Sequence, residues 1–310
     1  MNIIAIDAGG SKTRILILKK SDLTNEYYNN IKELTLGPCN YLTSGRQGIK
    51  KVVSEIINNF KITKTDQTSV FGGFAGAGSL HIKNDIKSIF INFGFKDNNI
   101  HITSDAELLL NALGHNSILL IAGTGSICVG KTKTNNFVRG GGYGYRFLEP
   151  GGYTLGIKAI EASLKIEDGI MQEDTILYEN TKDYFNVHQI KELIPMIYKD
   201  SQGYIETIAG VSKIVFNSAN DGDSFSLSLI GNLVTELSDL VVSVYKELKF
   251  NKCFLGFYGG LFDDKNSNEL LIKPIISKLK NESLNIKTET YYSKMKRDDI
   301  LIKALRNISD

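Results

Sequence analysis

The chain has 310 residues, of which 42% are hydrophobic and 23% charged, and only four are prolines. This composition excludes a long disordered region, and the length predicts two lobes of roughly 100–200 residues each. The 36 basic residues nearly balance the 34 acidic ones, so charge gives no reason to expect nucleic acid or a membrane as partner, and small molecules are favoured.

A Gly-rich polar segment interrupts the first apolar run. Asn2 to Ile6 and Arg14 to Lys19 are mainly apolar, and Asp7 to Thr13 lies between them, which predicts a strand, a tight turn and a second strand. The rest of this half predicts a strand at Glu33 to Leu36, a helix near Gly48 to Phe60, a strand at Ser69 to Phe74, a helix near Leu80 to Asn92 and a strand at Asn99 to Thr103.

The same arrangement begins again in the second half. Ser117 to Ala122 is apolar, Gly123 to Ser126 reads GTGS, and Ile127 to Lys131 is apolar again. The two glycine-tipped hairpins indicate an internal duplication, although so short a repeated pattern also arises by chance. Beyond them the pattern predicts a helix-rich insertion from about Tyr153 to Leu248, a strand at Lys252 to Phe257, a helix near Asn268 to Leu279, a strand at Leu284 to Tyr291 and a closing helix from about Lys296.

Each half places its strands first and then alternates strand and helix. This order predicts the α/β class, with a mixed sheet that is parallel in its alternating part. We expect one lobe over residues 1–115, to which a closing helix at 296–310 returns, and a second lobe over 116–295 with the insertion at 153–248. Open sheets of this type bind ligands beyond the carboxyl ends of their strands, where both glycine tips would lie.

The two glycine-rich tips are candidate phosphate cradles. In Asp7 to Thr13 a carboxylate at a strand end precedes two glycines and three polar residues, and successive backbone N–H groups can wrap a phosphate. A plain hairpin with a polar tip fits this segment equally well. Gly123 to Ser126 offers a second cradle, and two such loops facing each other across a cleft would hold both ends of a polyphosphate.

A rival nucleotide motif falls in the second hairpin. Gly125 to Thr132 matches GxxxxGK[ST] by letter, but that loop must lead into a helix. The apolar residues Ile127 to Val129 predict a strand, and Lys131 leads into a turn, so we interpret the match as false. The segment GAGSLH at Gly76 lacks the third glycine of a dinucleotide loop, which disfavours a Rossmann fold.

Several further residues have both a structural and a functional interpretation. Asp105 precedes an apparent helix that ends at Gly114, so it either caps the helix or, at a strand end, serves a ligand site. Asn40 either caps a turn or contacts a ligand. Gly140 to Gly144 fits a ligand-presenting loop or a linker, and Gly259–Gly260 fits close backbone approach to a ligand or a tight turn.

Other chemistries lack the residues they need. The three cysteines lie far apart without CxxC spacing, so neither a disulfide framework nor a cysteine metal site is predicted. The N-terminus lacks the features of a signal peptide, and no run approaches the ~20 apolar residues that cross a bilayer. We therefore expect a cytoplasmic protein.

Six short motifs follow one another along most of the chain. They are DAGGSKT (Asp7 to Thr13), GPCN (Gly37 to Asn40), FAGAGS (Phe74 to Ser79), SDAE (Ser104 to Glu107), GTGS (Gly123 to Ser126) and YGGLF (Tyr258 to Phe262). In these motifs the chain resembles the N-acetylglucosamine kinase and BadF/BadG-type ATPase family of the actin/hexokinase/Hsp70-like superfamily. The resemblance implies a duplicated actin-like (ribonuclease H-like) ATPase fold with two lobes around a nucleotide cleft. It also implies ATP-dependent phosphorylation of an amino sugar at the 6-hydroxyl, with N-acetylglucosamine preferred and N-acetylmuramic acid or glucosamine as alternatives.

The resemblance assigns a role to individual residues. Asp105 would be the catalytic base, and Asp7 would hold Mg²⁺ through water. The ATP phosphates would bind Gly9, Gly10, Ser11, Lys12, Thr13, Gly123, Thr124, Gly125 and Ser126, the adenosine would lie near Gly259 and Gly260, and the sugar would contact Asn40, Thr124, Tyr145 and Glu149. A homodimer with the amino sugar and ATP as its small-molecule partners is also implied.

One segment departs from the family pattern. Where the family has GGWG followed by a GDEGSGY-like run, this chain has GGYGYRFLEPGGY, one residue shorter. The acidic residue expected to bind sugar hydroxyls is therefore either replaced by Glu149 or missing. The alternative function is a sugar-responsive or partner-activating ATPase of the BadF type with little kinase turnover, although the cysteines show no arrangement for an activator's iron–sulfur cluster.

Overall fold

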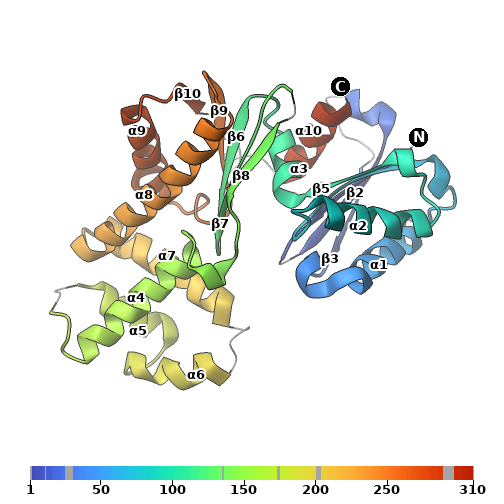
Figure 1. The fold of residues 1–310 in the computed structure, drawn as a ribbon. Coiled ribbons are helices and arrows are strands. Elements are labelled where there is room, and N and C mark those ends of the chain that lie inside the picture. The colour runs from blue at the N-terminus through green and yellow to red at the C-terminus, as the bar shows by residue number, and fades with distance from the viewer. Residues whose placement is uncertain are drawn as a thin grey trace. The chain divides into compact units, whose positions relative to one another are not determined.

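The computed structural model describes residues 2–10, 12–24, 31–134, 136–172, 175–199, 204–288 and 297–309. The chain divides into two compact units. The first unit comprises Met1–Gly114 and Met295–Asp310, and the second comprises His115–Lys294. Each unit is a sheet with helices packed on it (Figure 1).

The first unit is built on a five-stranded sheet of order β3-β2-β1-β4-β5. Strand β2 is antiparallel to β1 and β3, whereas β4 is parallel to β1 and β5, so the sheet is mixed, as the sequence pattern predicted. The strands are β1 (Asn2–Ala8), β2 (Thr13–Lys19), β3 (Lys32–Leu36), β4 (Thr68–Phe74) and β5 (Ile100–Ser104). The helices are α1 (Tyr41–Phe60), α2 (Leu80–Asn92), α3 (Asp105–Asn111) and α10 (Arg297–Ser309).

Helices α1 and α2 cover one face of this sheet (Figure 1). Side chains alternate between the two faces of a strand, so Ile4 and Ile6 of β1 point to the same face as Phe74 of β4. They pack with Ile56 of α1 and Phe90 of α2, and all five side chains are fully buried. The Phe74 and Phe90 rings meet edge to face at 6.3 Å, a favourable aromatic geometry.

The last helix of the chain completes the first unit. Arg306 Nε of α10 donates to the carbonyl of Leu23 at 2.7 Å. Asn307 Nδ2 donates to the carbonyl of Asn111 at 2.7 Å, the last residue of α3, and this carbonyl also accepts the N–H of Gly114 at 3.2 Å. The two ends of the sequence therefore belong to one folded unit.

Removal of the Asn307 amide should loosen this attachment. We expect Asn307→Ala to lower the free energy of unfolding by about 0.5–1.5 kcal/mol, because the Asn111 carbonyl loses the shorter of its two hydrogen bonds and keeps the one from Gly114 N–H. Urea unfolding followed by circular dichroism measures the change. The matched control is Asn92→Ala on the exposed last residue of α2, and an equal effect of both substitutions would contradict the expectation.

The second unit repeats the topology of the first. Its sheet has the order β10-β9-β6-β7-β8, with β7 antiparallel to β6 and β8, and β9 parallel to β6 and β10. The strands are β6 (Ser117–Ala122), β7 (Ser126–Lys131), β8 (Phe137–Gly141), β9 (Cys253–Tyr258) and β10 (Ile286–Thr288). The helices are α4 (Gly152–Glu167), α5 (Leu177–Phe185), α6 (Leu193–Lys199), α7 (Tyr204–Asn220), α8 (Ser224–Glu247) and α9 (Lys273–Asn281), the last preceded by a π-helical turn at Asn268–Ile272.

Helix α8 lies against this second sheet (Figure 1). A Cβ on Gly130 would lie 2.6 Å from Val244 Cγ1, so a glycine at this position lets the helix approach the strands closely. Among the described residues, α8 is the one helix long and apolar enough to pass a length-and-composition test for crossing a membrane. Its residues Leu237 and Val241 are fully buried in the core of the unit, so we interpret α8 as a core helix.

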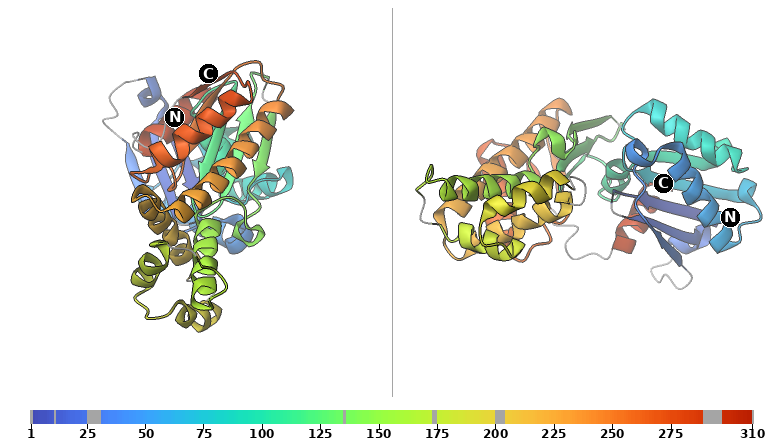
Figure 2. Two further views of the ribbon diagram at one scale, coloured as in Figure 1. Left: turned by 90° about the vertical axis from the view of Figure 1, so that its left-hand side faces the viewer. Right: turned by 90° about the horizontal axis from the view of Figure 1, so that it is seen from below.

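The insertion predicted from about Tyr153 to Leu248 is helical and corresponds to helices α4 to α8. Of these, α4, α5 and α7 pack together (Figure 2). A Cβ on Gly156 of α4 would lie 2.0 Å from the carbonyl oxygen of Ile208 in α7. The two helix backbones therefore approach each other at a point where only glycine fits.

The predicted duplication is confirmed, because both sheets have the same strand order and directions. The rejection of the GxxxxGK[ST] match is also confirmed, since the residues up to Lys131 form β7 and the next element of the described chain is a strand, β8. Strand β8 was missed because Gly140 and Gly141 were interpreted as loop. The strand predicted over Leu284 to Tyr291 is observed at Ile286–Thr288, and 289–291 lie outside the described residues.

Candidate functional site

The first glycine-rich tip connects β1 to β2. Asp7, near the end of β1, is 3% exposed. Gly9 N donates to the carbonyl of Lys12 at 3.0 Å, which closes the turn, while Gly10 and Lys12 are exposed. Ser11, predicted to bind phosphate, lies outside the described residues.

The connection from β3 to α1 lies against this hairpin. Cys39 N donates to the carbonyl of Gly9 at 3.0 Å. Asn40 is the N-cap of α1, and its Oδ1 accepts the N–H of Leu42 at 2.9 Å, so the capping interpretation of Asn40 is correct. This bond orients the amide and leaves the Nδ2 donors without a partner among the described residues. A Cβ on Gly76 would lie 2.5 Å from Asn40 Oδ1, so the glycine makes room for the amide.

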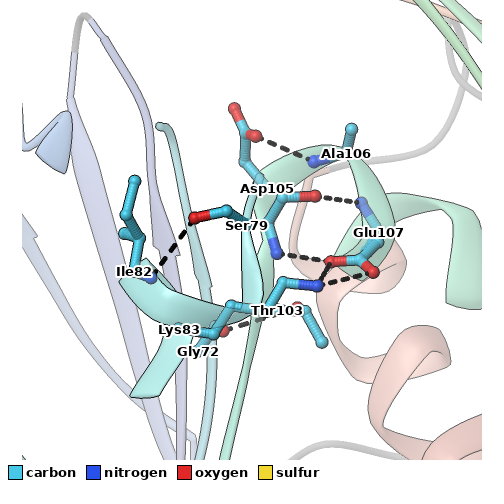
Figure 3. Close-up of polar contacts among 9 residues, drawn as sticks. Gly72, Ser79, Ile82, Lys83, Thr103, Asp105, Ala106 and Glu107 are labelled. Atoms are coloured by element: carbon cyan, nitrogen blue, oxygen red, sulfur yellow. Dashed lines mark hydrogen bonds and ion pairs between the residues drawn. The ribbon is translucent and has the colours of Figure 1, made fainter. Parts of the chain in front are cut away.

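Asp105 is the first residue of α3 but does not cap the helix (Figure 3). The cap is Ser104, whose Oγ accepts the N–H of Glu107 at 3.1 Å, while Glu107 Oε2 accepts the N–H of Ser104 at 2.8 Å. The alternative that Asp105 is a mere cap is therefore wrong, and the S-x-x-E spacing of a capping box could have revealed this. The half-buried carboxylate of Asp105 accepts the N–H of Ala106 at 2.9 Å and points away from the Lys83–Glu107 ion pair (Figure 3).

Asp7 and Asp105 lie at the same edge of the first sheet. The strand register aligns Asp7 with Gly73 of β4 and Gly73 with Thr103 of β5. Asp105 follows two residues beyond Thr103, so the two carboxylates are at the carboxyl ends of strands on either side of β4. This is the edge at which parallel α/β sheets bind ligands.

The second glycine-rich tip connects β6 to β7 and supports the start of α4. Gly123 N donates to the carbonyl of Gly125 at 2.9 Å within the turn. Gly152 N donates to the carbonyl of Gly123 at 2.7 Å, and Tyr153 N donates to the carbonyl of Thr124 at 2.9 Å. The carbonyls of this hairpin are therefore held by the first turn of α4.

Glu149 lies between this hairpin and the loop after β8. Its Oε2 accepts the N–H of Tyr143 at 2.9 Å, and its Oε1 accepts the N–H of Gly144 at 3.2 Å and, more weakly, that of Ser126 at 3.4 Å. Sequence reasoning could not find these contacts, because they depend on the path of the backbone.

The same loop carries aromatic side chains. The half-buried ring of Tyr145 packs edge to face on Tyr153 at 5.1 Å. Tyr143 and Phe147 are 65% and 74% exposed. Aromatic surface beside a few polar groups is typical of small-molecule sites.

Gly259 and Gly260 follow β9 next to the second hairpin. Gly259 has φ 110°, and a Cβ on it would lie 2.4 Å from the carbonyl oxygen of Ala122. A Cβ on Gly260 would meet nothing within 4 Å. Gly259 is therefore required by the fold, whereas Gly260 leaves open space that a ligand could occupy.

The two hairpins share a feature that fits a phosphate ligand. Thr13 begins β2 and Ser126 begins β7, and these residues are 0% and 4% exposed. Neither hydroxyl has a hydrogen-bond partner among the described residues. Buried hydroxyls normally have partners, so each hairpin offers a polar group that a phosphate oxygen or a water could satisfy.

The acidic residues suit Mg²⁺ bound with a nucleotide. Among the described residues, no group of three or more His, Cys, Asp or Glu side chains is arranged to hold a metal. Mg²⁺ commonly uses one or two carboxylates together with water and substrate phosphates. Asp7, beside the first hairpin, fits that smaller requirement.

Two other features of the units lie outside this chemistry. A cavity of about 610 Å³ in the first unit is lined by residues such as Asn2, Lys19 and Thr68, at the opposite end of the strands from Asp7, so its size does not mark it as the active site. In the second unit, burial raises the pKa of Cys253 to about 12. This thiol stays protonated at neutral pH and is a poor nucleophile.

Two proteins of known function are similar to the chain in sequence. An N-acetylmuramic acid/N-acetylglucosamine kinase of Clostridium acetobutylicum is 31% identical over 273 residues, covering 85% of this chain and 86% of the relative. An N-acetyl-D-glucosamine kinase of Dictyostelium discoideum is 26% identical over 303 residues, covering 91% and 92%. Both similarities extend over both units.

Solved structures share the fold. A candidate N-acetylglucosamine kinase from Chromobacterium violaceum superposes with a TM-score of 0.70 at 15% identity, covering 99% of this chain and 98% of the other. A ROK hexokinase from Thermus thermophilus superposes with a TM-score of 0.55 at 12% identity, covering all of both chains, 100% and 100%. These similarities support the predicted actin-like sugar kinase fold. The profile of the BadF/BadG/BcrA/BcrD ATPase family matches residues 4–293, and the chain belongs to this family.

Proposed function

We propose that the protein is an ATP-dependent kinase of an amino sugar, with N-acetylglucosamine as preferred acceptor and N-acetylmuramic acid or glucosamine as alternatives. Membership in an ATPase family implies the use of ATP, and both sequence relatives are kinases of N-acetylated amino sugars. The structural observation that carries the proposal is the Asp105 carboxylate, which lies at the ligand edge of its sheet and is not used as a helix cap.

In the proposed reaction Asp105 accepts the proton of the sugar 6-hydroxyl. The hydroxyl oxygen then forms a bond to the γ-phosphorus of ATP, and the bond between that phosphorus and ADP breaks. Asp7 would hold Mg²⁺ through water, and the ion would neutralise phosphate charge. Backbone groups of both hairpins, at 9–13 and 123–126, would bind the phosphates, and Gly259–Gly260 would lie near the adenosine.

On the sugar side we propose contacts from Asn40, Thr124 and Tyr145, and a role for Glu149 through the loop that follows β8, because backbone N–H groups already occupy its carboxylate. The bond that Asn40 Oδ1 accepts from Leu42 N–H orients the amide and would leave its Nδ2 donors available to the sugar, and Tyr145 would supply aromatic surface. We also propose a homodimer in the cytoplasm, without nucleic acid or membrane partners.

A second function is favoured by one observation. The Glu149 carboxylate is occupied by backbone N–H groups, which reduces its capacity to bind sugar hydroxyls. A sugar-responsive or partner-activating ATPase with little kinase turnover is therefore the competing proposal.

ADP release with Mg-ATP distinguishes the two functions. We expect turnover that depends on an added sugar in a panel of glucose, glucosamine, N-acetylglucosamine, N-acetylmannosamine and N-acetylmuramic acid, with the N-acetylated amino sugars preferred. Mass spectrometry of the product should show one added phosphate. ADP release that is unaffected by every sugar would refute the kinase and support the ATPase.

A further inference from the structure

The Glu149 carboxylate joins two segments of the second unit. On one side, the consecutive N–H groups of Tyr143 and Gly144 donate to Oε2 and Oε1 at 2.9 and 3.2 Å. On the other side, the N–H of Ser126 in the hairpin donates to Oε1 at 3.4 Å. Consecutive backbone N–H groups form a natural nest for an anion, and here the protein's own carboxylate fills the nest.

The surrounding glycines make room for this carboxylate. A Cβ on Gly125 would lie 2.5 Å from Glu149 Oε1, and a Cβ on Gly151 would lie 2.7 Å from Gly125 Cα. The backbone of Glu149 is also fixed, because Thr154 Oγ1 donates to its carbonyl at 2.7 Å. Both ends of the glutamate are therefore held in place before any ligand binds.

The loop over 142–148 has few other polar attachments. Gly142 N donates to the carbonyl of Ser126 at 2.9 Å at its start. Its remaining backbone bonds are internal, from Phe147 N to Gly144 O and from Leu148 N to Tyr145 O, each at 3.0 Å. Among the described residues, Glu149 is thus the side chain that fastens the middle of this loop to the hairpin.

We propose that Glu149 is a positioning residue that holds the loop over 142–148 against the second phosphate hairpin. It acts on the sugar through the loop, by fixing where Tyr145 lies relative to the hairpin. The proposal rests on the proposed kinase function for its kinetic consequence, but not for the tether.

Amide hydrogen exchange in the ligand-free protein tests the tether directly. In Glu149→Gln, an NH₂ group replaces one accepting oxygen and faces an N–H donor. We expect exchange at Tyr143 and Gly144 to accelerate on the order of tenfold, because a charge-assisted bond is lost. The matched control, Glu161→Gln, changes an exposed carboxylate of the same unit that pairs with Lys165 and should leave both amides unchanged. Equal exchange in the wild type and Glu149→Gln would overturn the proposal.

Kinetics then test the consequence of the tether. We expect Glu149→Gln to raise the KM for the sugar on the order of 10- to 100-fold through misplacement of the loop, while the Kd for MgADP stays near the wild-type value. Glu149→Asp keeps the charge on a shorter side chain, so this variant should fold. Its KM for the sugar should lie between those of the wild type and Glu149→Gln.

Three further results would overturn the proposal. One is an unchanged sugar KM despite faster exchange. The second is tighter MgADP binding by Glu149→Gln, which would mean that the carboxylate competes with phosphate for the hairpin. The third is a sugar KM in Glu149→Asp that rises as far as in Glu149→Gln although amide exchange at Tyr143 stays at the wild-type rate. If the wild-type protein has no sugar-dependent turnover, the kinase proposal fails, and the exchange experiment still decides the tether.

Discussion

Asp105→Asn should remove most of the sugar-dependent turnover. We expect kcat to fall on the order of 10²- to 10⁴-fold, because an amide cannot take the proton of the attacking hydroxyl. The substitution keeps the size of the side chain, and an amide oxygen can still accept the N–H of Ala106. Helix α3 should start normally, since Ser104 and Glu107 form its cap. A coupled ADP assay at saturating sugar and ATP measures the loss.

A matched substitution separates chemistry from charge. Asp97 in the same unit pairs with Lys87 at 2.9 Å and has a side chain that is 62% exposed. Exposed ion pairs contribute only about 0–1 kcal/mol, so Asp97→Asn should retain full activity. Sugar-dependent turnover by Asp105→Asn at the rate of this control would exclude Asp105 as the base.

Gly259→Ala should destabilise the second unit severely. The residue has φ 110°, where a side chain costs about 1–3 kcal/mol. The new Cβ would also meet the Ala122 carbonyl oxygen at 2.4 Å, and such overpacking costs about 1–3 kcal/mol more. That carbonyl also accepts the N–H of Leu261 at 3.1 Å, so relief of the clash would disturb the turn after β9. Differential scanning calorimetry should show a lower unfolding temperature. Added nucleotide should raise that temperature less than in the wild type, because binding is reduced.

The same change elsewhere in this unit should have the opposite sign. Gly231 lies in α8, is exposed, and a Cβ there would meet nothing within 4 Å. Alanine in a helix interior is favoured over glycine by about 0.5–1 kcal/mol, so Gly231→Ala should raise the unfolding temperature. Two alanine variants with the same effect would show that the backbone at Gly259 is not specially constrained.

The duplication explains why candidate ligand residues occur in pairs. In the first unit, the connection from β3 to α1 holds Asn40 and bonds to the hairpin through Cys39 N. In the second unit, the corresponding connection from β8 to α4 holds Glu149 and bonds to the other hairpin through Gly152 N. The same topology thus places a capping or anchoring polar side chain beside each proposed phosphate turn.

Most of the fold could be read from local patterns. Strands β1, β6 and β9 and helix α2 lie within one or two residues of their predicted positions, because apolar runs bounded by glycine report directly on buried strands and turns. Helix α1 begins at Tyr41 rather than near Gly48, because Asn40 caps a first turn that the φ of 55° at Gly45 separates from the rest.

The chemistry-bearing residue types, the order of the elements and the glycine tips follow from the amino-acid sequence, since each depends on neighbours along the chain. The tertiary structure decided which groups surround the Glu149 carboxylate and that Gly140 and Gly141 lie in a strand under α8. A hydrogen bond depends on where distant backbone atoms lie to within a fraction of an ångström. No local pattern carries that information, so the partners of Glu149 became known only once the second sheet and its connecting loops were in place.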